Sequence, residues 1–314
     1  MFSEHEFINN IISKYVVFNS IRDDVYTEKG LIYKIDGFQL SYTFSFMDLY
    51  DLGWKAVIST VSDIISKGGI PSLFFSSIGI PKSKLDKLEN LIEGMADAIK
   101  YYHGKYVGGD LNSSDGSGWI DIMGIGLSTC NSNKDIDDGD VVIISNSIGY
   151  TSLVFLSYVR SWNIHLPKKV INKIRHPIVN KGIVKIIEKY CTNISYSTDV
   201  SDGLIVSLYN IVKRKNVTVE LKQIPIDPEV KEMTDSLGVE IKDILKYSGE
   251  EFETLLVVRK SVVEEVMREM RKYGLNPIVI GEVIKNKNSE GKNNVLYKGE
   301  VIENTGWDNF LGWF

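Results

Sequence analysis

The chain has 314 residues, 43% hydrophobic and 25% charged, which allows two domains with ordinary cores and excludes a disordered protein. Its formal net charge of -5 gives no support for a nucleic-acid-binding protein, although cations could still bring phosphates to its carboxylates. No apolar run approaches the roughly 18 residues that span a bilayer, and the N-terminus shows no signal peptide, so we expect no membrane partner.

The two cysteines, Cys130 and Cys191, are far apart in the sequence and follow no metal-ligand spacing. We therefore expect both to be reduced and structural. Reduced cysteines are typical of cytosolic proteins, so the sequence predicts a cytoplasmic location.

The first half of the chain alternates apolar strands with amphipathic helices. The patterns predict strands over 31–38, 72–80, 104–110 and 119–130, and helices over 51–69 and 83–102. Gly68 and Gly69 should end the first of these helices.

A polar, acidic stretch, 131–140, separates this half from a second half of the same mixed kind. We expect a domain boundary there, giving an N-terminal domain over 1–137 and a C-terminal domain over 138–314. The second half should hold strands over 141–145, 217–222, 253–259 and 277–284, and helices within 146–159, 203–212 and 261–274. The last helix should begin with a Ser261/Glu264 capping box.

The segment "STDVSDGL", 197–204, sets Asp199 and Asp202 three residues apart, directly before a predicted helix. Asp and Ser are good N-cap residues, so a helix start is one interpretation. Carboxylate oxygens at a helix N-terminus also suit Mg²⁺ together with phosphate. Both interpretations are compatible, and we expect a helix start that also forms one wall of a site for Mg²⁺ and phosphate.

Acidic residues beside glycines or at the ends of elements recur along the chain. They include Asp24, Asp36, Asp63, Asp110 and the glutamates of 250–253. A single such residue is usually a turn residue or a cap, but the set suggests convergent ligands for more than one Mg²⁺. Bound Mg²⁺ would neutralise charge on phosphate oxygens, which is what phosphoryl transfer requires. The chain has neither a Walker motif nor a protein-kinase loop, so an enzyme of this kind would depend on metal ions.

In their order, these segments resemble the thiamine-monophosphate kinases, of the aminoimidazole-ribonucleotide-synthetase-like superfamily, along nearly the whole chain. The matching motifs are "RDD" (22–24), "YKID" (33–36), "VSDIISKGGIP" (61–71), "GGD" (108–110), "DVSDGL" (199–204), "GEEFE" (249–253) and "GWDNF" (306–310). "DVSDGL" preceded by the "VSD" and "GGD" motifs is a fairly specific combination.

The resemblance implies an α+β fold of two α/β domains, the first forming a barrel with its twin in a homodimer. It implies direct transfer of the γ-phosphoryl group of ATP to thiamine monophosphate, with several Mg²⁺ ions and no catalytic side chain. The implied metal ligands are Asp24, Asp36, Asp63, Asp110, Asp199 and Asp202. The implied ATP-binding residues are Gly109, Asp110, Lys134 and Ser201, and the implied substrate-binding residues are Thr43, Glu250 and Trp307. Trp307 could instead be a C-terminal aromatic plug.

The chain departs from the family pattern beside the strand-end Asp36. The family's small hydroxyl pair is Lys34–Ile35 here, so a cation could lie near the metal cluster. Thr43 stands where the family has a histidine. Two alternatives therefore stay open: another ATP-using member of the superfamily with a different acceptor, and a non-catalytic nucleotide-binding regulatory relative. Selenophosphate-forming and hydrogenase-maturation relatives are disfavoured because their cysteines are missing from the corresponding positions.

Overall fold

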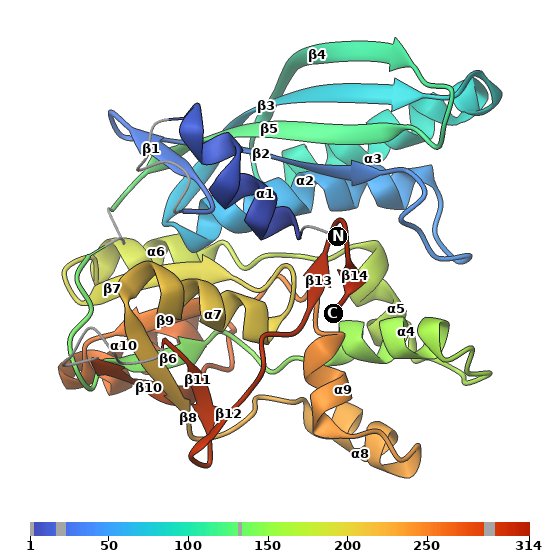
Figure 1. Cartoon of the computed structure of the whole chain (residues 1–314). Helices are drawn as coiled ribbons and strands as arrows, with labels where there is room; N and C mark the ends of the chain where they lie inside the picture. The colour runs from blue at the N-terminus through green and yellow to red at the C-terminus, as the bar shows by residue number, and fades with distance from the viewer. Residues whose placement is uncertain (1–2, 17–22, 131–133, 286–292) are drawn as a thin grey trace.

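The computed structural model describes residues 3–16, 23–130, 134–285 and 293–314. It contains a five-stranded and a seven-stranded sheet, each with helices, which confirms the predicted mixed α/β architecture. Figure 1 shows the two sheets as an upper and a lower layer, with helix α2 between them and both chain ends at the junction. Within the described residues, no helix combines the length and apolar character needed to cross a membrane.

The first sheet has the order β1-β2-β5-β3-β4, in which β3 and β4 are parallel and the other pairs antiparallel. The elements of this half are α1 (Glu4–Asn10), η1 (Ile12–Lys14), β1 (Tyr26–Glu28), β2 (Leu31–Gln39), α2 (Leu49–Ser66), β3 (Gly69–Ile80), η2 (Lys82–Lys87), α3 (Leu88–Tyr101), β4 (Lys105–Ser113) and β5 (Trp119–Ser128). The predicted helix over 83–102 therefore begins as a 3₁₀ turn, and the α-helix starts only at Leu88.

Helix α2 is the central element of the molecule. Asp48 caps it, and Asp51 completes a capping box with the Asp48 backbone. Most of its side chains are buried, because it packs on β2, β3 and β5 on one side and reaches β7 and β9 of the second half on the other. Gly68, at φ +76°, follows its last turn. A helix in this position presents its polar side chains to the junction between the two halves.

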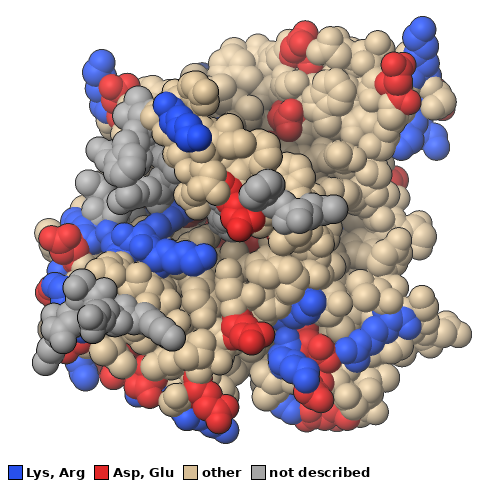
Figure 2. Space-filling model, viewed as in Figure 1, with Lys and Arg blue, Asp and Glu red and all other residues tan. Residues whose placement is uncertain are grey.

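Among the described elements, no helix packs on the opposite face of the first sheet. Ile35, Ile70, Met123 and Leu127 lie on this face and are between 37% and 67% exposed. Figure 2 shows that this upper part of the molecule carries few charged side chains over its strands. We refer to these four residues as the open apolar face.

The second sheet has the order β12-β11-β8-β10-β6-β9-β7. The strands of the second half are β6 (Val141–Ile144), β7 (Ile194–Asp199), β8 (Val217–Leu221), β9 (Thr254–Val258), β10 (Ile278–Lys285), β11 (Val295–Tyr297), β12 (Glu300–Val301), β13 (Trp307–Asp308) and β14 (Gly312–Trp313). The helices are α4 (Tyr150–Val159), α5 (Lys168–Arg175), α6 (Gly182–Lys189), α7 (Leu204–Lys215), α8 (Pro228–Ser236), α9 (Ile241–Lys246), η3 (Lys260–Val262) and α10 (Val263–Lys272). The last two strands, β13 and β14, form a separate hairpin beside the junction.

The capping box predicted at Ser261 is wrong. Residues 260–262 form a 3₁₀ turn, and α10 begins after Val262 with no side-chain cap. Because this 3₁₀ turn runs directly into α10, Ser261 lies inside the helical segment. Its side chain is therefore not beside the free backbone N–H groups at the start of the helix.

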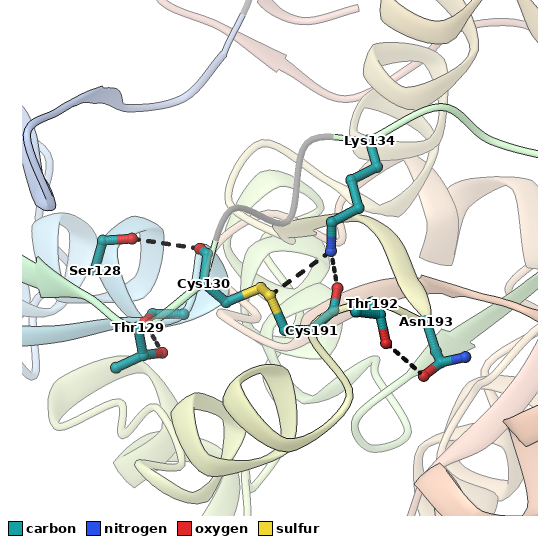
Figure 3. Close-up of a disulfide and its surroundings, with 8 residues drawn as sticks. Ser128, Thr129, Cys130, Lys134, Cys191, Thr192 and Asn193 are labelled. Carbon is teal, nitrogen blue, oxygen red and sulfur yellow. Dashed lines mark hydrogen bonds between the residues drawn. A yellow bond between two sulfur atoms is a disulfide. The ribbon is translucent and has the colours of Figure 1, made fainter.

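The expectation of two reduced cysteines is also wrong. Cys130, after β5, and Cys191, after α6, form a disulfide with their Cα atoms 5.7 Å apart (Figure 3). The bond joins residues that are 61 positions apart. Spacing along the chain could not indicate this pairing, because the approach depends on how the two halves pack.

Candidate active site

A cavity of about 440 Å³ opens at the junction of the two halves. Its wall includes residues of β2, the loop before α2, the start of α7 and the C-terminal hairpin. The sequence-predicted residues on it are Asp36, Thr43, Ser201, Asp202, Glu250 and Trp307. Six of the predicted site residues, from five separate segments of the chain, therefore share one cavity.

A cluster of four carboxylates extends from the cavity wall, where two of them lie, to two buried positions at the junction. Asp36 comes from β2, Asp63 from α2, Asp199 from the end of β7, and Asp202 from the turn before α7. Burial raises the pKa values of Asp63, Asp199 and Asp202, and the charges of neighbouring members of the group raise them further because these carboxylates lie close together. We refer to these four residues as the acidic cluster.

Asp199 ends its strand as a buried residue. The Ser62 hydroxyl of α2 donates a hydrogen bond to its Oδ2, so this contact crosses between the two halves. Burial raises the pKa of Asp199 to about 6, partly offset by the Ser62 hydrogen bond. A nearby cation would stabilise the ionised form of this buried carboxyl group by neutralising its negative charge.

Asp202 does not cap helix α7, which corrects the helix-cap interpretation of the segment. The N-cap position belongs to Gly203, at φ +123°, and the Leu204 backbone N–H donates to Ser248 Oγ at 3.0 Å. The Asp202 side chain instead lines the cavity, and within the described residues it has no hydrogen-bond or ion-pair partner. Burial, followed by the Asp36 charge, raises its pKa to about 8.

Asp24 lies next to the cluster but is already neutralised by protein cations. Its carboxylate is 2.8 Å from Arg214 Nη2 and 3.4 Å from Lys67 Nζ, and Thr198 Oγ1 donates to it at 2.6 Å. Although burial acts to raise the pKa of Asp24, Lys67 and Arg214 hold it well below its usual range. Asp24 is therefore ionised and paired at neutral pH.

Aromatic rings also line the cavity. Trp307 contacts Trp313 and Tyr42 edge-on, with ring centroids 5.2 and 5.8 Å apart. The Trp307 backbone N–H donates to the Asp202 carbonyl at 2.9 Å, which fixes the hairpin beside the acidic cluster. Thr43 stands on the same wall, where its hydroxyl donates to the Phe44 carbonyl at 3.3 Å.

Glu250 is joined to a site residue that the sequence reasoning missed. Lys55 of α2 is only 3% exposed, lines the cavity, and places Nζ 2.8 and 2.9 Å from the two Glu250 carboxylate oxygens. The sequence did contain a signal for this residue, a lysine among the apolar positions of 51–66. A lysine buried there needs a carboxylate partner, so it could have been predicted to lie at the site.

Three predicted ATP- and metal-binding residues lie away from this cavity. Gly109 and Asp110 belong to β4, the edge strand of the first sheet. Strands β5 and β3 lie between β4 and β2, the strand that carries Asp36. Asp110 pairs with Ser77 on the open side of the sheet, whereas Asp36 is on the side toward α2. Lys134 donates through Nζ to the Cys191 carbonyl beside the disulfide (Figure 3).

The donor set suits a hard divalent cation, because carboxylate oxygens are the ligands that Mg²⁺ prefers. The unpartnered, cavity-facing carboxylate of Asp202 and the neighbouring Asp36 and Asp199 are the groups that fit one best. Within the described residues, no three candidate ligands stand in a ready-made metal geometry. Lys34 lies 2.6 Å from Asp63 and 3.4 Å from Asp36, so a protein cation already separates two of the carboxylates.

Comparisons with known proteins agree on one family. The AIR synthase related protein N-terminal domain matches residues 15–128, and the corresponding C-terminal domain matches residues 137–292. The thiamine-monophosphate kinase of Pyrobaculum calidifontis is 27% identical over 93% of this chain and 91% of its own length. That of Pyrococcus abyssi is 31% identical over 85% of this chain and 81% of its own length. A solved structure, "AaThiL complexed with AMPPCP and TMP", superposes with a TM-score of 0.83 at 23% identity, covering 98% of this chain and 97% of the other.

Proposed function

This chain belongs to the AIR synthase related family and, within it, to the thiamine-monophosphate kinases, and we propose that it transfers the γ-phosphoryl group of ATP directly to thiamine monophosphate. The products would be ADP and thiamine diphosphate. Mg²⁺ ions would assist the transfer, and ATP would be the co-substrate.

One observation carries this proposal: a single cavity is lined both by carboxylates and by aromatic rings. The carboxylates suit cation-bound phosphates, and the rings suit a flat, cationic thiazolium through stacking and cation–π attraction. Thiamine monophosphate combines these two chemistries in one molecule. The acceptor oxygen of a phosphate is already largely anionic at neutral pH, so the reaction needs no catalytic base.

We propose the following roles for the predicted residues. The metal ligands are Asp24, Asp36, Asp63, Asp110, Asp199 and Asp202; the ATP-binding residues are Gly109, Asp110, Lys134 and Ser201; the substrate-binding residues are Thr43, Glu250 and Trp307. Bound Mg²⁺ would neutralise charge on the phosphate oxygens during transfer. Asp199, oriented by Ser62, and Asp202, fixed beside the Trp307 backbone, are the best supported ligands.

We also propose that the domains are divided between residues 137 and 138 and that the N-terminal domains of two chains associate. The open apolar face supports a homodimer, because an uncovered sheet face of this kind is stabilised by burial against a second copy. A cytoplasmic location stays a prediction. The disulfide is unusual for that compartment, although intracellular disulfides do occur in hyperthermophiles.

A second candidate is an ATP-using relative with another acceptor, or a regulatory relative without turnover. Lys34 within the acidic cluster, together with Thr43 on the cavity wall, supports it.

Formation of ADP and thiamine diphosphate from ATP, Mg²⁺ and thiamine monophosphate separates these candidates, with a reaction lacking the acceptor as control. We expect equal amounts of the two products, and only when the acceptor is present. Asp202→Asn should fold normally and lose most of this activity. Mg–ATP binding without product would instead support the second candidate.

A further inference from the structure

Lys34 brings a protein cation into the acidic cluster. Its Nζ lies 2.6 Å from Asp63 Oδ2 and 3.4 Å from Asp36 Oδ2, and its side chain is 17% exposed. Residues 34 and 36 share one face of β2 because side chains alternate along a strand, and this face is turned toward α2. The β5 partner of Lys34 is Gly124, which has no side chain to displace the ammonium group.

The other nearby cations are held elsewhere. Lys67 and Arg214 both pair with Asp23 and Asp24, neither of which lines the cavity as Asp36 does. Lys55 pairs with Glu250 on the cavity wall. Lys34 is therefore the lysine that balances charge between Asp36 and Asp63.

We propose that the Lys34 ammonium takes the place of one divalent cation between Asp36 and Asp63, so that this chain binds fewer metal ions than its carboxylates could hold. An ammonium group and a divalent cation repel each other strongly at the few ångströms that separate these oxygens. Lys34 is then a positioning residue, because it holds Asp36 and Asp63 in place while the remaining ions bind Asp199 and Asp202. Of the metal ligands proposed above, Asp36 and Asp63 would then share no ion of their own between them. The inference rests on the proposed function only in assigning these ions to a nucleotide-phosphate site.

Mn²⁺ binding to the full chain, without nucleotide or acceptor, tests the proposal directly. Titration followed by electron paramagnetic resonance gives the number of bound ions and their affinity. We expect Lys34→Gln to bind an additional ion or to bind Mn²⁺ at least about tenfold more tightly, because a repelling charge is removed from the oxygens. Lys34→Arg, which keeps the charge, should match the unchanged protein.

Lys173→Gln is the matched control. Lys173 is also paired with two carboxylates, at 2.8 Å from Glu253 and 3.9 Å from Glu251, and its side chain is 19% exposed. It lies on α5, outside the acidic cluster, so its removal should leave Mn²⁺ binding unchanged. Equal Mn²⁺ binding by Lys34→Gln and the unchanged protein would overturn the proposal, as would an additional ion in Lys34→Arg.

Thermal unfolding gives a second measurement. In EDTA, Lys34→Gln should unfold at a lower temperature than the unchanged protein, because the acidic cluster has lost its cation. Mg²⁺ should raise the Tm of Lys34→Gln more than that of the unchanged protein. An equal rise in both would contradict the proposal. If Lys34→Gln does not fold, Lys34→Ser can replace it as the variant without the charge, and Lys34→Arg remains the variant that keeps it. None of these measurements depends on kinase activity.

Discussion

The carboxyl group of Asp202 combines an unusual protonation state with a position on the cavity wall. Burial and the Asp36 charge raise its pKa to about 8, whereas an aspartate in an unfolded chain titrates near about 4. The folded protein therefore binds more protons than the unfolded chain between these pH values. The free energy of unfolding must then fall as the pH rises through this window. Asp199, with a pKa raised to about 6, acts in the same direction.

We predict that the Tm measured in EDTA falls as the pH is raised from about 5 to about 8. Asp202→Asn should make this fall shallower, because it removes one of the groups whose ionisation is unfavourable in the folded state. Mg²⁺ should reduce the fall in the unchanged protein by stabilising the ionised carboxylates. An Asp202→Asn variant with the full pH dependence would show that Asp202 does not carry this effect.

Trp307 supplies aromatic surface to the cavity wall. We predict that Trp307→Ala raises the KM for thiamine monophosphate more than the KM for ATP, because the proposed role of the ring is to bind the thiazolium. Trp307→Phe should retain most of the acceptor affinity. Equal changes in both KM values would support the alternative that Trp307 is a C-terminal plug.

At the scale of elements, helix α2 depends on close contact with α3. Gly53 and Gly94 permit this contact: a Cβ on Gly94 would lie 2.0 Å from the Tyr50 carbonyl oxygen, and one on Gly53 would lie 2.0 Å from that of Leu91. These are backbone atoms, so neither helix can relieve the clash by moving a side chain. The position of α2 in turn determines where Ser62 and Asp63 lie.

We predict that Gly94→Ala destabilises the protein by about 1–3 kcal/mol, or more if α2 cannot shift. Urea unfolding would measure this loss. Gly116→Ala is the control, because no atom lies within 4 Å of the Cβ it would add. If the two variants lose equal stability, the cause is the glycine-to-alanine change itself and not helix packing.

At the scale of the whole molecule, the two halves are joined both by a shared core and by the Cys130–Cys191 disulfide. The larger core cluster contains residues of α2, β5 and β9, so it extends across the junction. The disulfide closes a loop of 61 residues, and cross-links of this span typically stabilise a protein by about 3–4 kcal/mol.

We predict that a reductant lowers the free energy of unfolding of the unchanged protein by up to this amount. The double variant Cys130→Ala/Cys191→Ala should start at the lower stability and should not respond to reductant. A response of the same size in the double variant would mean that the disulfide is not the cause.

Much of the fold was predictable from the sequence because its signals are local. The apolar alternation of 31–38 and the amphipathic pattern of 51–69 require only neighbouring residues, and both elements form close to the predicted positions. The predicted helix start after Asp202 is confirmed, but the side-chain caps expected at Asp202 and Ser261 do not form. In both cases the backbone conformation at the start is set by tertiary packing, not by the local capping residue.

The sequence by itself determined the kinds of residue available for the site and the motifs that carry them, because their order along the chain is specific to the family. Only the tertiary structure decided that Asp36, Asp202 and Trp307 meet at one cavity, with Asp199 buried behind its wall. It also decided that Cys130 reaches Cys191 and that the Lys34 ammonium lies between two carboxylates. The reason is physical: distances between side chains from separate elements depend on how α2 packs between the two sheets, and no spacing along the chain records them.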